Sequence, residues 1–227
     1  MHSIAAVIGN SDGIGLSLTR ELLGQGWKVS GISRSASPVE NPEYTHSIGR
    51  VQDPGYPAVL QGRIGERPVD LCVYCAGIGN PLDPLHMDSE AEALEVNLLG
   101  MVKTAAVVIP SMVERGTGHF IGLSSVADEL LSPEAPGYHA SKAGVTSYLE
   151  SLALALKPQG IRVTNVRFGF VDTKMAKGDV KPFMLSVEQA TRHLFTCIEK
   201  KPVRSTAPRI VIPLVKFRRW MMRLKTF

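Results

Sequence analysis

Short apolar runs alternate along the chain with longer segments of helical periodicity, and this alternation restricts the fold more than any other feature. Runs of strand length occupy residues 4–8, 29–32, 69–74, 119–123, 161–166 and 209–212, with a weaker one near 45–51. Helical patterns occupy 14–23, 89–114, 137–156 and 186–200,. Pro110 predicts a kink or break in the second of these. We therefore expect a doubly wound α/β fold, with one parallel sheet and helices on both faces.

The sequence divides into one domain, residues 1–213, and a basic tail, residues 214–227. The net charge is +4, but the tail alone carries five bases and no acid, so the rest of the chain is near neutral. Three cysteines cannot form a disulfide framework, and we expect a reduced, cytoplasmic setting,. The first residues lack the features of a signal peptide, and no run of 18 apolar residues predicts a membrane-spanning helix,.

A glycine-spaced turn joins the first predicted strand to the first predicted helix. It consists of Gly9, Asn10, Ser11, Asp12, Gly13, Ile14 and Gly15. Gly9 permits a tight turn, Gly13 lets the backbone approach a pyrophosphate, and Gly15 allows close packing of helix and strand. The start of the helix offers free N–H groups to an anion. Such glycines also occur in ordinary turns, but the strand–turn–helix context favours dinucleotide binding.

Tyr138 and Lys142 lie four residues apart at the start of the 137–156 helix, which puts them on one face,. A free phenol has a pKa of about 10, and a nearby ammonium group lowers it by stabilising the phenolate. The pair could therefore act as a general acid and base. The alternative is a core tyrosine beside a surface lysine.

The glycine turn and the Tyr138-x-x-x-Lys142 pair occur together with Ser125, thirteen residues before the tyrosine, and with Asn97. Over about residues 3–200, this combination resembles the short-chain dehydrogenase/reductase family. The resemblance implies that Tyr138 exchanges a proton with the substrate oxygen, which Ser125 holds. Lys142 would lower the tyrosine pKa and bind the nicotinamide ribose, and the backbone of Asn97, at a helix kink, would hold a water. Ser124 competes with Ser125 for its role, but the spacing favours Ser125.

The resemblance also implies which residues bind an NAD(P) cofactor. Ala76 and Gly77 would approach the adenosine ribose, Val51 would contact adenine through its backbone, and Val171 and Thr173 would hold the nicotinamide carboxamide. The complete predicted set is Gly9, Ser11, Asp12, Gly13, Ile14, Gly15, Ser33, Arg34, Val51, Cys75, Ala76, Gly77, Tyr138, Lys142, Val171 and Thr173.

The cysteines and histidines indicate no other chemistry. Cys72 and Cys75 have a C-x-x-C spacing, but on a strand they point to opposite faces, about 10 Å apart and beyond disulfide reach. Cys75 stands where the family usually has asparagine, a departure that bears on stability or cofactor affinity. The six histidines show no ligand spacing, and we expect no metal.

The end of the second predicted strand indicates the type of cofactor. Family members that use NAD usually have an acid there, whereas this chain has Ser33, Arg34 and Ser35. Arg34 could bind a 2′-phosphate in a bidentate manner. Asp12 argues the other way, because its carboxylate would repel that phosphate unless Arg34 pairs with it. We expect NADP(H) to be favoured over NAD(H).

The loops that line the substrate cleft in the family are largely apolar here. They contain Leu130, Leu131 and Pro133; Ile78, Pro81 and Leu82; and Met175, Phe183 and Met184. A hydrophobic ketone or alcohol is therefore the expected substrate of an NADPH-dependent oxidoreductase. The alternative is a regulator or sensor that binds NAD(P) without turnover. The family commonly assembles through the helices at 89–114 and 137–156, which implies a homodimer or homotetramer.

The basic tail interleaves its charges with large apolar side chains. At helical spacing, Phe217, Trp220, Met221 and Leu224 share one face,. Packing on the chain's own domain or on a partner subunit is the interpretation we favour. Peripheral contact with an anionic membrane is the second. Nucleic-acid binding is the third, and we do not expect it.

Overall fold

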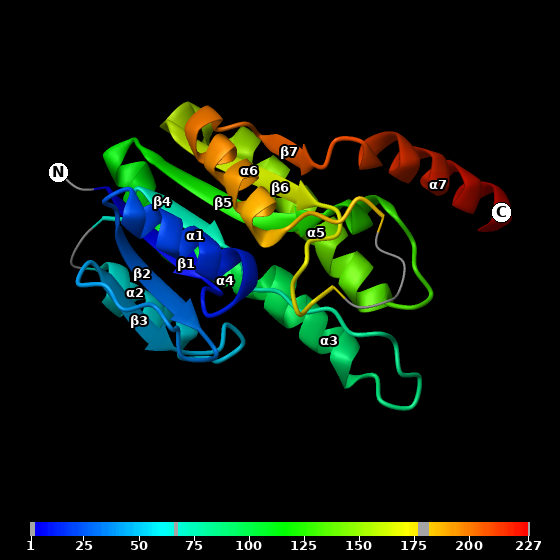
Figure 1. Ribbon diagram of the computed structural model, residues 1–227, viewed down its shortest axis with the longest axis horizontal. Helices are drawn as coiled ribbons and strands as arrows, with labels where there is room; N and C mark the ends of the chain where they lie inside the picture. Colours follow the sequence, from blue (N-terminus) through cyan, green and yellow to red (C-terminus); the bar gives the residue numbers. More distant parts are fainter. Residues whose placement is uncertain (1–2, 66–67, 177–181, 227) are drawn as a thin grey trace.

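The computed structural model describes residues 3–65, 68–176 and 182–226, and within these ranges seven parallel strands form one sheet (Figure 1). The strands are β1 (Ile4–Ile8), β2 (Lys28–Ser33), β3 (Tyr44–Ile48), β4 (Leu71–Tyr74), β5 (Gly118–Ser125), β6 (Ile161–Phe168) and β7 (Arg204–Ala207). Their order is β3-β2-β1-β4-β5-β6-β7. The strand order reverses beside β1, and a ligand crevice is expected where the carboxyl ends of β1 and β4 diverge.

Helices cover both faces of the sheet, which confirms the predicted doubly wound α/β fold. One face carries α1 (Gly13–Gly24) and α6 (Val187–Lys200), in front of the sheet in Figure 1. The other carries α2 (Tyr56–Ile64), α4 (Gly100–Arg115) and α5 (Pro136–Leu156). Successive side chains along β1 point to opposite faces of the sheet, so β1 contributes to both hydrophobic cores. Ala5 and Val7 face α1 and α6, while Ala6 and Ile8 face the other helix layer.

The end of the chain differs from the prediction. A strand was expected at 209–212, but the last strand is β7, and residues from Val211 onward form the helix α7 (Val211–Thr226). A short apolar run fits a strand or a helix equally well. Pro213 fits the helix because the first turn makes no use of its missing N–H. The predicted tail 214–227 therefore belongs to a helix that starts within the segment expected to be the last strand.

The segment expected to be one helix over 89–114 is α3 (Asp88–Leu94), a π-helical turn (Glu95–Leu99) and α4. Of the kink or break predicted at Pro110, the break is absent, since α4 continues through that residue. The irregularity lies at the π-helical turn, which contains Asn97. By length and composition alone, Asp88–Arg115 could cross a membrane. However, Met101, Ala105 and Met112 are buried in the domain core, so we assign this segment to the core.

Helix α2 was missed because the segment before it is rich in proline, serine and glycine. Tyr56, Leu60 and Ile64 are buried at intervals of four residues. That spacing fits a helix, but a pattern of three residues is too short to be recognised among the surrounding turn-forming residues.

Candidate active site

The predicted site residues converge at the carboxyl ends of β1, β4 and β5. Gly9, directly after β1, has a φ of +84°, and a Cβ there would lie 2.5 Å from the amide nitrogen of Ala76. A Cβ at Gly77 would lie 3.3 Å from Oδ1 of Asn97 and 3.7 Å from Nζ of Lys142. Glycine at these positions therefore lets the turn after β1 and the loop after β4 approach the predicted catalytic side chains.

Tyr138, Lys142 and Ser125 lie together. Tyr138 and Lys142 are one turn apart on α5, and Nζ of Lys142 is 5.8 Å from the centre of the phenol ring. Ser125 ends β5 and lies beside the Tyr138 side chain. Its Oγ accepts a hydrogen bond from the Ala127 amide at 3.2 Å, which orients the hydroxyl. This cluster presents a phenol, an ammonium group and a hydroxyl at one point.

Burial governs the protonation of this cluster. Desolvation raises the pKa of Tyr138, while the nearby Ser125 hydroxyl opposes the rise. Desolvation also lowers the pKa of Lys142 to about 8, opposed by the nearby carboxylate of Asp128. The sequence predicted a lowered tyrosine pKa through Lys142. The structure shows the opposite direction, because the ring is desolvated and the ammonium group donates to the Leu123 carbonyl oxygen at 3.0 Å,.

The structure separates the two candidate serines. Ser124 is buried, with its Oγ 3.2 Å from the Lys142 carbonyl oxygen and 2.9 Å from Oγ1 of Thr146. It therefore fastens β5 to α5. Ser125, one residue later on the strand, points the other way and lies beside Tyr138,.

Asn97 connects three parts of the site through its side chain. Its Oδ1 accepts from the Ile78 amide at 2.8 Å, and its Nδ2 donates to the Ile78 carbonyl oxygen and to Oγ of Ser141, both at 2.9 Å. The loop after β4 is thereby tied to α5. The family resemblance suggested only a role for the Asn97 backbone, so this side-chain role is an addition from the structure.

Three further residues support the cluster and were not found from the sequence. A Cβ at Gly79 would lie 2.9 Å from the Tyr138 ring, so this glycine lets the loop after β4 pass over the phenol. Glu90 on α3 accepts from the Gly137 amide at 2.5 Å and so binds the start of α5. Neither has a local sequence signal, since each acts on a residue distant in the chain.

Asp128, the third, belongs to a buried ionic network. Its carboxylate lies 2.5 Å from Nη2 of Arg167 and accepts from Oγ1 of Thr146 at 2.6 Å. Only 1% of the Asp128 side chain and 5% of the Arg167 side chain are exposed. Glu129 joins the network at 2.7 Å from the same Arg167 nitrogen. The network fixes the turn that follows Ser125.

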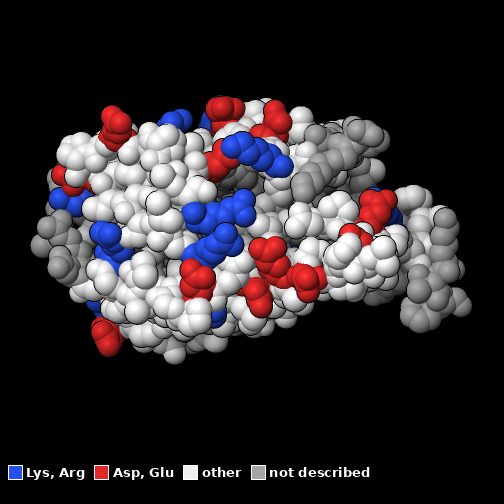
Figure 2. Space-filling view, turned by 90° about the horizontal axis from the view of Figure 1, so that it is seen from below, with Lys and Arg blue, Asp and Glu red and all other residues white. Residues whose placement is uncertain are grey.

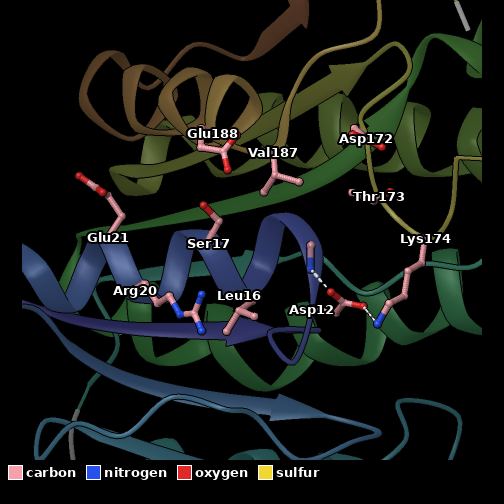
Figure 3. A pocket seen from close by; sticks show the side chains of 11 residues that line it. Asp12, Leu16, Ser17, Arg20, Glu21, Asp172, Thr173, Lys174, Val187 and Glu188 are labelled. Carbon is pink, nitrogen blue, oxygen red and sulfur yellow. Dashed lines mark hydrogen bonds and ion pairs between the residues drawn. The ribbon is translucent and has the colours of Figure 1, made fainter.

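A groove of about 720 Å³ lies where α1 and α6 begin, beside the loop after β6 (Figure 3). Asp12 caps α1 by accepting from the Gly13 amide at 2.8 Å. Its carboxylate is 2.6 Å from Nζ of Lys174, and these two interactions lower the pKa of Asp12. Among the described side chains, Asp12 pairs with Lys174 and not with Arg34, the partner considered from the sequence.

Of the residues predicted to bind a cofactor, Asp12, Gly13 and Thr173 line this groove, and others lie in the segments next to it in the chain. Thr173 reaches the glycine turn, because a Cβ on Gly13 would lie 3.2 Å from its methyl group. Val171 is fixed by a bridge to Leu185. Ser11 is half-buried in the turn, and Ile14 and Cys75 pack against the core on the α1 and α6 face. The ends of the loop after Thr173 are described, whereas residues 177–181 of the predicted lid lie outside the described ranges.

The end of β2 has the charge expected for a phosphate site. Arg34 is exposed, while Ser33 is buried, with its Oγ 2.8 Å from the Ser35 carbonyl oxygen. Arg50 is exposed just beyond the neighbouring strand β3, and Val51 is buried in the core. Figure 2 shows a hollow in the surface with lysine or arginine side chains on both sides. The glycine cradle, the start of α1 and these bases fit an anionic dinucleotide.

Other ligand chemistry finds little support. Cys72 and Cys75 are free thiols, and burial raises the pKa of Cys75 to about 12. Within residues 3–65, 68–176 and 182–226, no three His, Cys, Asp or Glu side chains are grouped as metal ligands.

Comparison with known proteins agrees with this geometry. A family model described as short chain dehydrogenase matches residues 58–182. An uncharacterized oxidoreductase of Staphylococcus saprophyticus is 30% identical over 189 residues, covering 76% of this chain and 80% of that protein. Dehydrogenase/reductase SDR family member 7B of Danio rerio is 34% identical over 111 residues, covering 48% of this chain but only 36% of that protein.

A solved structure shows the same fold. It is a short chain dehydrogenase from Burkholderia cenocepacia in complex with NADP, with a TM-score of 0.84 and 21% identity, and the match covers 95% of this chain and 92% of that one.

Proposed function

Because the chain belongs to the short-chain dehydrogenase/reductase family, we propose that it is an NADP(H)-dependent oxidoreductase that reduces the carbonyl group of a small, largely apolar substrate, or oxidises the corresponding alcohol. The observation that carries the proposal is the convergence of Tyr138, Ser125 and Lys142 beside the glycine cradle.

The chain's own residues handle the substrate oxygen and its proton. In reduction, the Tyr138 hydroxyl donates its proton to the carbonyl oxygen, and in oxidation the phenolate takes the proton back. The raised pKa of Tyr138 keeps the phenol protonated at neutral pH, as the reductive direction requires. Ser125 donates a hydrogen bond to the same oxygen. Lys142 stabilises the phenolate left after proton transfer. The bound nicotinamide supplies or accepts the hydride.

The preference for NADP(H) rests on charge at the end of β2. Arg34 is exposed there with no acid beside it in the sequence, and the carboxylate of Asp12 is neutralised by Lys174. The repulsion that Asp12 would exert on a 2′-phosphate is thereby reduced. One solved relative of the same fold was crystallised with NADP.

The apolar substrate class is supported by the side chains at the strand ends. Leu131, Met175, Phe183 and Met184 expose apolar surface in loops next to the catalytic cluster. We also propose a cytoplasmic homodimer or homotetramer, assembled through α4 and α5 as in the family. Leu99 and Leu154 leave exposed apolar surface at the start of α4 and on α5.

The test is oxidation of NADPH or NADH by the purified chain with a panel of apolar ketones, together with cofactor binding followed by fluorescence. We expect turnover with at least one ketone and a higher kcat/KM with NADPH. Cofactor binding without turnover on any ketone or alcohol would instead support the regulator. That alternative has one favouring observation: Asp12 already occupies the first free N–H of α1.

A further inference from the structure

Helix α7 docks on the domain through one side only. Val211 and Val215, one turn apart, are buried against it. Further along, Nη1 of Arg219 lies 3.5 Å from Glu129, in the short turn after Ser125. Figure 1 shows α7 at the β7 edge of the molecule, extending beyond the ends of the strands. Of the face predicted from the sequence, Phe217 and Trp220 are exposed, whereas Met221 is half-buried.

The outward side of α7 is apolar. Leu214, Phe217 and Trp220 are 50%, 61% and 56% exposed, and the rings of Phe217 and Trp220 lie 6.0 Å apart. A helix on the surface of a water-soluble domain normally turns polar side chains outward and apolar ones inward. Here both sides are apolar. On the outward side, Leu214 and Phe217 are exposed, and Trp220 lines an open groove with Glu129, Lys216 and Arg219. Leu224, predicted on this face, has a side chain outside those described.

Basic side chains flank the exposed apolar side. At 3.6 residues per turn, Lys216 and Arg218 lie on opposite sides of the stripe formed by Phe217 and Trp220. Both are exposed. From Val211 to Phe227 the sequence has five bases and no acid. The exposed side of α7 is therefore apolar in the middle and cationic along both borders. It matches a surface whose interior is apolar and whose outer groups are negatively charged.

We propose that α7 docks the protein on an anionic lipid surface. The helix lies in the plane of the interface, with Leu214, Phe217 and Trp220 at the boundary of headgroups and acyl chains. Lys216 and Arg218 extend to the phosphates on either side. Pairing of two α7 helices is disfavoured because each brings five positive charges and no acid to the contact,. This proposal does not depend on the proposed reaction.

The experiment uses the full chain with Trp27→Phe, which leaves Trp220 as its one tryptophan. Vesicles of phosphatidylcholine alone are compared with vesicles containing 30% phosphatidylglycerol. We expect co-sedimentation and a blue shift of Trp220 emission with the anionic vesicles, both lost in high salt. Equal binding to the neutral vesicles, or no binding to either, would overturn the proposal. Co-sedimentation of the unsubstituted chain gives the same answer if Trp27→Phe disturbs folding.

Paired substitutions locate the contact. Phe217→Ser with Trp220→Ser, and separately Lys216→Glu with Arg218→Glu, should each weaken anionic vesicle binding at least tenfold. Val59→Ser on α2 and Arg162→Glu on β6, which are exposed elsewhere, should leave it unchanged.

Light scattering and titration with duplex DNA distinguish the other occupants. The proposal requires the same oligomeric state in the Phe217 and Trp220 variant as in the unsubstituted chain. Dissociation of an oligomer in that variant would assign the face to a second copy of the chain. DNA that binds more tightly than anionic vesicles would assign it to nucleic acid.

Discussion

The proposed catalytic cluster of Tyr138, Lys142 and Ser125 contrasts with the proposed phosphate end of the cofactor site, formed by Asp12, Lys174 and Arg34. Lys142 is buried and bound to a backbone carbonyl of the central sheet, one helical turn from Tyr138. Asp12, Lys174 and Arg34 are exposed, in the segments that follow β1, β6 and β2. The first region has its geometry imposed by the core. In the second region the side chains can adopt many rotamers, because an exposed ion pair holds a side chain in one conformation only weakly.

We therefore expect substitutions in the two regions to impair different steps of the reaction. Substitution in the buried cluster should reduce the rate of the chemical step, because its atoms cannot rearrange to compensate. Substitution at the phosphate end should change cofactor affinity and leave the step itself intact. The predictions that follow test this separation.

Lys142→Met carries the largest expected effect. The substitution removes the ammonium group that stabilises the Tyr138 phenolate, and kcat should fall by about 10²- to 10⁴-fold. Steady-state kinetics at pH 7 measure the loss. Lys157→Met, at an exposed lysine just beyond the end of α5, is the matched control and should behave as wild type. A Lys142→Met variant with a normal kcat would remove Lys142 from the mechanism.

Arg34→Met should raise the KM for NADPH by about 10- to 100-fold and leave the KM for NADH unchanged, because a charge-assisted contact to the 2′-phosphate is lost. The kcat at saturating NADPH should stay the same. Arg162→Met serves as the control. Equal changes in the KM values for NADPH and NADH would show that Arg34 does not bind the 2′-phosphate.

The pH dependence comes from the buried lysine. Because its pKa lies near 8, the kcat for ketone reduction should be level below about pH 7. It should fall by about tenfold per pH unit above pH 8 as the ammonium group is lost. A pH–rate profile checks this. In Lys142→Arg the fall should move to higher pH, since arginine stays protonated. An unshifted fall in that variant would assign the titration to another group.

The same pKa affects stability with a definite sign. The unfolded chain keeps the Lys142 proton up to about 10.5, whereas the folded chain loses it near 8. Between these values the unfolded state binds more protons. The free energy of unfolding should therefore rise with pH, relative to Lys142→Met, by roughly 3 kcal/mol in total. Urea titrations of the two proteins at pH 7.5 and 10 measure the difference.

Asp12→Asn has the smallest expected effect. Asparagine still caps α1, but the exposed pair with Lys174 is lost and Lys174 becomes available to the cofactor phosphates. Affinity for NADPH should rise about two- to fivefold, with Tm unchanged. Glu188→Gln, in the same groove, controls for the loss of one negative charge. A fall in affinity would mean that Asp12 helps to hold the cofactor.

The same contrast explains how much the sequence could predict. The sequence could predict that Tyr138, Lys142, Ser125 and the glycine turn lie together, because fixed spacings on regular elements determine their positions. The ion pair of Asp12 with Lys174 was not found, because it joins loops 162 residues apart in the chain. The direction of the Tyr138 pKa shift also depends on burial, which spacing does not reveal. Helix α7 was mistaken for a strand at its start because an apolar run of three residues has no period.

In the proposed function, Tyr138 is the proton donor of a carbonyl reductase. Tyr138→Phe removes only the hydroxyl, and Tyr148→Phe removes one from the same helix. With a ketone that the wild type reduces, we measure single-turnover NADPH oxidation at pH 7 and NADPH binding by fluorescence. Tyr138→Phe should bind NADPH within about threefold of wild type and oxidise it about 10²- to 10⁴-fold more slowly, while Tyr148→Phe matches wild type. Turnover at the wild-type rate in Tyr138→Phe would contradict the account.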